Sequence, residues 1–110
     1  MNEKLRPPEW WPRRDRCAQL LPRAIERTFP DPTARGRVAA RLARTYPLTR
    51  EEARIGLALV FLSGGDEARL ERDLAIADRD WRDIIVAAEN NRAYAALFFA
   101  WIAELDASAR

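Results

Sequence analysis

Apolar residues recur at three- and four-residue steps along most of this chain, which is the spacing of one face of an α-helix. The first such segment contains Cys17, Leu20, Leu21, Ala24 and Ile25. Pro22 lies inside this segment. It either kinks the helix or begins a second one, because proline removes a backbone donor and crowds the preceding turn. Phe29-Pro30 ends the segment.

Capping signals place the next two helices. Asp31-Pro32 combines an N-cap residue with proline at the first helical position, and it predicts a helix over residues 32–45. Thr49-Arg50-Glu51-Glu52 has the form of a capping box and begins a third helix. This helix is apolar nearly all round through residues 55–62 and ends at Ser63-Gly64-Gly65. A helix without a polar side is typical of the centre of a bundle.

Three more helices follow in the second half. Asp66 can cap a helix over residues 67–77, and Asp78 or Asp80 can cap the next one. Asn90-Asn91 predicts a break, because asparagine tolerates the left-handed conformation at helix ends. The last helix is expected over residues 92–105 and has two apolar faces. One face carries Tyr94, Leu97, Phe98, Trp101 and Leu105, and the other carries Phe99 and Ile102.

These elements predict an all-α fold, a compact bundle of five or six short helices without β-sheet. No segment alternates with period two over a useful length. We expect the third helix and the last helix to form the centre. Residues 1–8, which end in Pro7-Pro8, are predicted to be a loose N-terminal arm, and residues 9–110 a single helical domain, since 110 residues is close to the commonest domain size.

Composition agrees with a folded domain and gives no sign of a membrane span. Hydrophobic residues make up 48% of the chain and charged residues 33%. The longest apolar run covers residues 93–103, about half of the roughly 20 residues that a spanning helix needs. The first residues are polar and rich in proline, unlike a secretory signal. We therefore expect a cytoplasmic protein.

The residues that carry most enzyme chemistry are missing from this sequence. It has no histidine, Cys17 is its single cysteine and Lys4 its single lysine. Ser-His and Cys-His pairs and the usual zinc sites are therefore excluded. Asp78, Asp80 and Glu89 occupy positions 1, 3 and 12 of a calcium loop, but Asp83 replaces the glycine that the loop needs. We expect no metal, no cofactor and no enzymatic activity.

Basic residues are concentrated in the first half of the chain. Residues 1–55 carry thirteen Lys or Arg and seven Asp or Glu, whereas residues 56–110 carry six and ten. Arg37, Arg41 and Arg44 lie on one side of the second predicted helix and could contact a phosphate backbone. The third predicted helix is too apolar to read base edges. Nucleic-acid association through this arginine stripe is therefore the alternative function.

Aromatic residues favour a protein partner as the main hypothesis. Trp10 and Trp11 lie next to Arg13 and Arg14, and tryptophan and arginine are common at interface hot spots. The same tryptophans could instead fold the arm onto the bundle. The second apolar face of the last helix could close a homodimer. The sequence thus predicts a non-enzymatic protein-interaction module, adaptor or regulatory, whose partner it does not identify.

One region resembles a known family. The segment from Arg54 to Asp66 is an apolar helix that ends in a Gly-Gly turn, and the segment from Asp80 to Glu89 begins Asp-Trp-Arg-Asp and ends Ala-Glu. Together with the early Trp-Trp pair, residues 54–89 are similar to a family of small bacterial proteins of uncharacterised function. The resemblance implies a bacterial, cytoplasmic protein, and it assigns no activity and no functional residue.

Overall fold

The computed structural model describes residues 14–45 and 52–108, and these residues form five α-helices and one π-helical turn. In chain order they are α1 (Arg14–Thr28), α2 (Pro32–Thr45), α3 (Glu52–Ser63), α4 (Glu67–Ile85), η1 (Val86–Asn90) and α5 (Ala95–Ser108). No strand occurs in the described ranges, so the predicted all-α bundle is confirmed.

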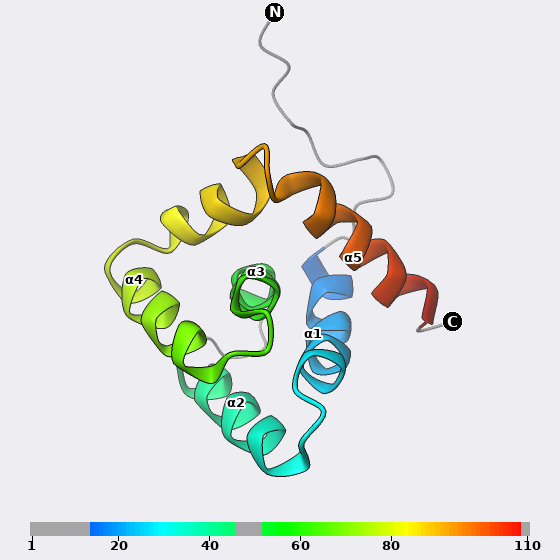
Figure 1. The fold of residues 1–110 in the computed structure, drawn as a ribbon, viewed down its shortest axis with the longest axis vertical. Coiled ribbons are helices and arrows are strands. Elements are labelled where there is room, and N and C mark those ends of the chain that lie inside the picture. Colours follow the sequence, from blue (N-terminus) through cyan, green and yellow to red (C-terminus); the bar gives the residue numbers. More distant parts are fainter. Residues whose placement is uncertain (1–13, 46–51, 109–110) are drawn as a thin grey trace, which may run out of the picture.

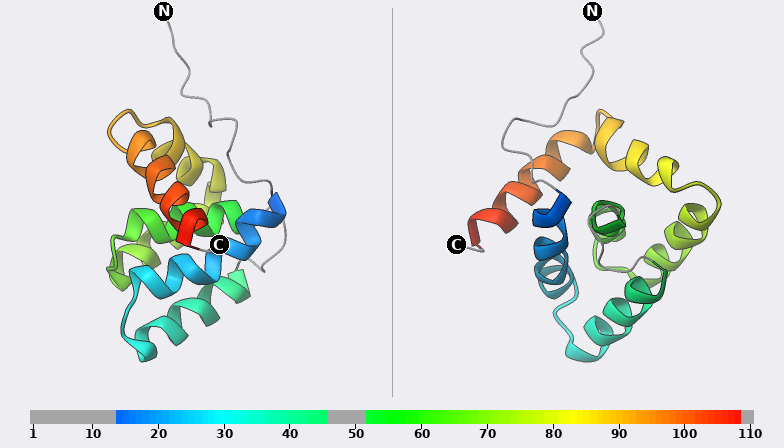
Figure 2. Two further views of the ribbon diagram at one scale, coloured as in Figure 1. Left: turned by 90° about the vertical axis from the view of Figure 1, so that its right-hand side faces the viewer. Right: turned by 180° about the vertical axis from the view of Figure 1, so that it is seen from behind.

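The apolar helix α3 lies at the centre of the bundle, as its sequence predicts. The other elements surround it when the molecule is viewed along α3, and the view from behind shows the same arrangement (Figures 1 and 2). Helices α1 and α4 provide most of its packing. Its buried apolar side chains are Ala53, Ile55, Leu57, Ala58, Leu59, Val60 and Leu62. This helix therefore supplies the middle of the hydrophobic core.

The expectation that the last helix also forms the centre is wrong. Helix α5 lies at the edge of the bundle and covers the core with one face only (Figure 1). Leu97 on this helix keeps 60% of its surface exposed. The reason is geometric: α3 is already enclosed on its other sides, so α5 contributes one side to the core and leaves Leu97 and several alanines outside.

Helix α1 continues through Pro22, which does not split it. Leu20, Leu21 and Ala24 are completely buried, whereas Pro22 lies on the exposed side of the helix. Water can satisfy the carbonyl that loses its backbone donor on that side. The position of Pro22 opposite the core therefore explains why the helix tolerates it.

Helix α2 begins as predicted, because Oδ2 of Asp31 accepts a hydrogen bond of 3.0 Å from the backbone N–H of Ala34. Val38 and Leu42 are the two side chains of α2 that belong to the buried core. The rest of the helix lies along the edge of the bundle farthest from η1 (Figure 1). The capping box predicted at residues 49–52 lies outside the described side chains.

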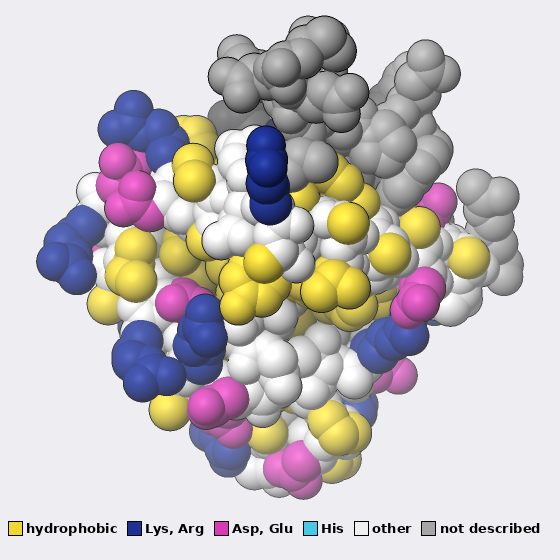
Figure 3. Space-filling view, turned by 45° about the horizontal axis from the view of Figure 1, so that its top comes forward, with side chains coloured by type: hydrophobic (Ala, Val, Ile, Leu, Met, Phe, Trp, Pro, Cys, Tyr) yellow, Lys and Arg dark blue, Asp and Glu magenta, His cyan; other side chains and the backbone are white. Residues whose placement is uncertain are grey.

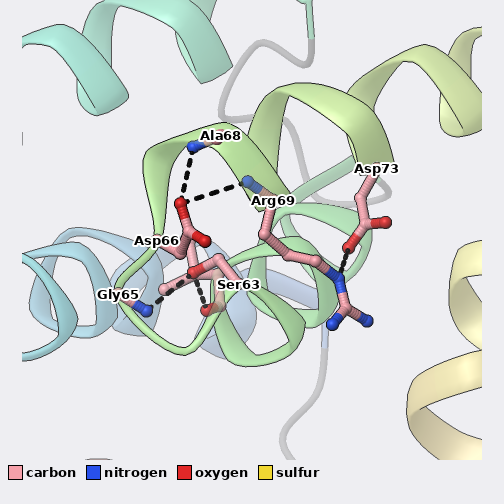
Figure 4. A network of polar contacts seen from close by, with 7 residues as sticks. Ser63, Gly65, Asp66, Ala68, Arg69 and Asp73 are labelled. Atoms are coloured by element: carbon pink, nitrogen blue, oxygen red, sulfur yellow. Dashed lines mark hydrogen bonds and ion pairs between the residues drawn. The ribbon is translucent and has the colours of Figure 1, made fainter.

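A tight turn joins α3 to α4, as the Ser-Gly-Gly-Asp sequence predicts (Figure 4). The φ angles of Gly64 and Gly65 are +58° and +89°, a region that residues with a Cβ rarely adopt. Ser63 Oγ donates to the carbonyl of Val60 and accepts from Gly65 N–H. Oδ1 of Asp66 accepts from the first free N–H groups of α4, at 2.9 Å from Ala68 N. The turn is a helix stop followed by an N-cap.

Two helical segments form α4, and they meet at Asp80. The backbone of Asp80 is extended (φ −157°, ψ 99°), and its Oδ1 accepts from Arg82 N–H at 3.1 Å. The two predicted helices are therefore present, and Asp80 caps the second one.

The chain breaks at Asn91 as predicted, but the physical reason given for the break is wrong. Asn91 has a φ of −80°, not a left-handed one, and it caps the following helix by accepting from Ala93 N–H.

Candidate functional site

Helix α5 has no charged residue between Arg92 and Glu104, so its sequence does not mark which face is buried. The structure buries Ala95, Phe98, Ile102 and Leu105. The structure divides the first of the two expected apolar faces, because Phe98 and Leu105 are buried whereas Tyr94 and Leu97 point to solvent. Packing against α1 and η1, together with the contact of Phe98 with Phe61 of α3, selects the buried face, since apolar residues lie on every side of this helix up to residue 103.

An aromatic cluster fixes the rotation of α5 about its axis. The ring centroids of Phe61 and Phe98 are 4.9 Å apart, and those of Phe61 and Trp101 are 5.4 Å apart. Phe98 is fully buried and Trp101 is half-buried at the border of the core. Such ring pairs add to the burial energy of the side chains. With these rings inside, the neighbouring positions of α5 must face outward.

We call the exposed apolar side of this helix the outer face of α5. It consists of Ala96, Leu97, Ala100 and Ala107 on the helix and of Ala93 and Tyr94 in the turn directly before it, with the half-buried Trp101 at its border. Hydrophobic side chains gather along α5 in the space-filling view (Figure 3). A surface helix normally turns a charged or polar side to water, and over three turns this one does not. Exposed apolar side chains that adjoin one another are typical of a binding surface.

Charged residues frame the two ends of the outer face. Arg92 is exposed immediately before α5, and Glu104 is exposed near its end. Arg27 of α1 pairs with Oε2 of Glu104 at 2.9 Å. Arg23 of the same helix donates to the carbonyl of Ser108 at 3.2 Å. Helix α1 thus binds the carboxyl end of α5 and leaves the apolar stretch before it uncovered.

Arg54 of α3 and Glu89 of η1 form an ion pair that was not predicted from the sequence. Arg54 donates through Nε to Oε2 of Glu89 at 2.7 Å and through Nη2 to Oε1 of the same carboxylate. The carboxylate is buried, whereas the guanidinium is partly exposed. The hydrogen bonds with Glu89 raise the pKa of Arg54. The sequence signal that could have indicated this pair is a charged residue in each segment, Arg54 and Glu89, among apolar positions that face the core.

The arginine stripe of α2 is present, but α4 neutralises two of its three members. Arg37 pairs with Glu67 at 2.7 Å and Arg41 pairs with Glu71 at 3.2 Å, while Arg44 is exposed. The hydrogen bonds of Arg37 lower the pKa of Glu67. A shallow groove of about 350 Å³ lies between the two helices. The pairs serve to hold α2 against α4, so a phosphate group would have to compete with two glutamates.

The structure does not describe the side chains of the predicted partner patch. Trp10, Trp11 and Arg13 lie outside the described residues, and of Arg14 the structure describes the backbone that begins α1. In the described ranges no three histidine, cysteine or acidic side chains converge as metal ligands. Asp80 instead binds Arg82 of its own turn at 2.9 Å.

Comparison with known proteins adds no relative. No family model, no curated protein and no solved structure matches this chain. The resemblance of residues 54–89 to a bacterial family therefore stays a prediction. Among the helices described, none combines the length and the apolar character that crossing a membrane requires.

Proposed function

We propose that this chain is a non-enzymatic, cytoplasmic protein-interaction module that binds its partner through the outer face of α5. The observation that carries the proposal is the exposure of Leu97 in the first turn of α5, within a stretch that has no charge from residue 93 to residue 103. Leaving such a surface in water costs about 25 cal/mol per Å² of apolar area, and a partner that covers it recovers this free energy.

The chemistry of the chain supports a binding role over a catalytic one. Without histidine, and with its sole lysine at position 4, the sequence lacks the usual general bases and Schiff-base donors. The carboxylates with resolved hydrogen bonds serve as helix caps or as partners of arginine. Trp10, Trp11, Arg13 and Arg14 are proposed as a second contact patch of the same module.

A capture experiment with matched variants tests the outer face. Tagged wild-type protein, Leu97→Glu and Ala39→Glu are each exposed to an extract of source cells, and the retained proteins are quantified by mass spectrometry. Ala39 is exposed on α2, so the control makes a similar change away from α5. We expect a protein that wild type and control retain and that Leu97→Glu loses by at least about tenfold. Equal retention by all three, with unchanged helicity, would overturn the proposal.

The alternative, contact with a nucleic-acid backbone through Arg37, Arg41 and Arg44, has weaker support because Glu67 and Glu71 occupy two of the three guanidinium groups. Binding to a random duplex at low salt distinguishes the two functions. A phosphate-binding stripe would give affinity that falls steeply with salt and weakens when the three arginines are replaced by glutamine. The proposed module should show no such difference between wild type and the triple variant.

A further inference from the structure

The seam of α5 that faces solvent has the spacing of a helix-pairing surface. Ala93, Ala100 and Ala107 recur every seven residues, and Leu97 and Glu104 fall between them. Two helices that present apolar residues at such alternating steps of three and four can pack along one another. Small side chains let the two helix axes approach to about 8 Å, the lower end of the usual range.

Charges near the two ends of α5 run against the dipole of this helix. Asn91 caps the helix, and its carbonyl accepts from Ala95 N–H at 2.8 Å, so Arg92 begins the helical pattern. The amino end of a helix carries partial positive charge and favours an anion, whereas Arg92 places a cation there. Glu104 places an anion near the carboxyl end. The two residues are twelve positions apart, which corresponds to about 18 Å along a continuous helix.

The two ends differ in how the chain compensates these charges. At the carboxyl end, Oε2 of Glu104 accepts from Arg27, and no described residue donates to Oε1. At the amino end, no described carboxylate forms an ion pair with Arg92. An acidic group from outside the bundle would satisfy both the guanidinium and the helix terminus there.

We propose that the outer face of α5 binds a second copy of this chain, with the two α5 helices antiparallel. This inference rests on the proposed function and names its partner. A two-fold axis near the level of Phe98 brings Arg92 of each copy to Glu104 of the other. It also places Leu97 of each copy against Ala100 of the other. A parallel pair would bring like charges together at both ends, which is repulsive.

The oligomeric state of the full chain is the first measurement. Light scattering after size exclusion, over a range of concentrations, should give twice the monomer mass of 12.6 kDa for wild type and for Ala39→Glu. Leu97→Glu should give the monomer mass with unchanged helicity, because Leu97 is exposed in the single chain.

Charge exchange tests the antiparallel arrangement. Arg92→Glu alone and Glu104→Arg alone should each dimerise at least about tenfold more weakly, since every dimer would then hold two like-charged pairs. A 1:1 mixture of the two variants should recover the dimer, because each pair then joins opposite charges. Recovery in the mixture also separates the intermolecular effect from the loss of the Arg27–Glu104 pair, which the mixture does not restore.

Three results would overturn this antiparallel α5 dimer. A monomer at every concentration would do so, and if Leu97→Glu still lost a captured protein, the proposed function would stand with a different partner. A dimer that persists in Leu97→Glu would place the interface elsewhere. A full chain that becomes dimeric only after residues 1–13 are removed would show that its own first residues, and not a second copy, cover the outer face.

Discussion

Glu89 carries a charge that is almost completely removed from water, whereas its partner Arg54 keeps 40% of its side chain exposed. The two members of this ion pair should therefore respond differently to removal of the other. After Glu89→Gln, the guanidinium of Arg54 can turn to solvent. After Arg54→Met, the carboxylate stays inside the bundle without its partner, which is the costly case.

We expect Arg54→Met to lower the free energy of unfolding by about 3 kcal/mol and Glu89→Gln by about 1–2 kcal/mol, with chemical denaturation as the measurement. The double variant Arg54→Met/Glu89→Met should recover most of the loss, because two apolar side chains of similar volume leave no charge behind. If Glu89→Gln were the more damaging single change, burial of an unpaired carboxylate would not be the main cost of breaking this ion pair.

Asp80 acts at the break in α4, where its carboxylate accepts from both the side chain and the backbone N–H of Arg82. These hydrogen bonds lower the pKa of Asp80 below its ordinary value of 3.8. A lowered pKa in the folded state means that the charged form stabilises the fold. This contribution is complete above the ordinary pKa and is lost as the pH falls through the lowered one.

The pH dependence separates the charge of Asp80 from its capping role. Asn is as good an N-cap as Asp, so Asp80→Asn should lower the melting temperature at neutral pH through the lost charge alone. The difference from wild type should close as the pH falls through the lowered pKa of Asp80 and the carboxylate becomes protonated. Asp80→Ala should keep a deficit even there, because alanine cannot cap. A pH-independent deficit in Asp80→Asn would contradict this assignment.

At the scale of elements, the crossing of α1 over α3 depends on Gly56. A Cβ at this position would lie 2.8 Å from Cδ2 of Leu21, a side chain that is itself fully buried. Alanine is a better helix former than glycine by about 1 kcal/mol, and overpacking a core costs about 1–3 kcal/mol. We expect the steric cost to exceed the gain in helix propensity, because Leu21 is fully buried and can move only against other core side chains.

Gly36 on α2 provides the matched control, since nothing lies within 4 Å of a Cβ at that position. Gly36→Ala should therefore raise the free energy of unfolding by up to about 1 kcal/mol, or the melting temperature by about 4 °C. Gly56→Ala should lower it by about 1 kcal/mol. Equal stabilisation by both substitutions would show that the α1–α3 crossing relaxes without cost.

The elements that the sequence predicts well are those with local signals. Asp31, Asp66 and Asp80 cap their helices through side-chain bonds to residues two or three positions ahead, and such bonds depend on neighbouring sequence alone. The central position of α3 also follows from its own apolar sequence. The sequence could not show whether Pro22 kinks its helix or begins a second one, because the effect of proline depends on whether it faces the core or the solvent.

The candidate site required the three-dimensional arrangement. The sequence of α5 indicates two apolar faces but not which one the bundle covers, and Phe61 on α3 makes that choice through its contact with Phe98. The pairs of Arg37 and Arg41 with α4 join residues 30 positions apart and follow from no local pattern. The arginine stripe was therefore predictable as a feature, and its neutralisation was not.

For the whole molecule, the main question is whether the helices open together. Cys17 is 1% exposed in the core, among the residues through which α1 packs on α3. A thiol reagent can reach it only when α1 separates from the core. If this opening requires unfolding of the entire bundle, the labelling rate follows the equilibrium population of the unfolded chain. If the first turns of α1 open alone, the rate is independent of the stability of distant helices.

Gly36→Ala distinguishes these cases, because its added stability lies on α2 and does not touch Cys17. A gain of about 1 kcal/mol should slow labelling about fivefold if the bundle opens as a unit, with mass spectrometry following the modified fraction. The comparison is best made in the Leu97→Glu background, since dimerisation would itself slow the labelling by mass action. We expect the fivefold effect, because α3 lies between α1 and α4 and packs extensively on both. An unchanged rate would instead show that α1 frays while the rest of the core stays closed.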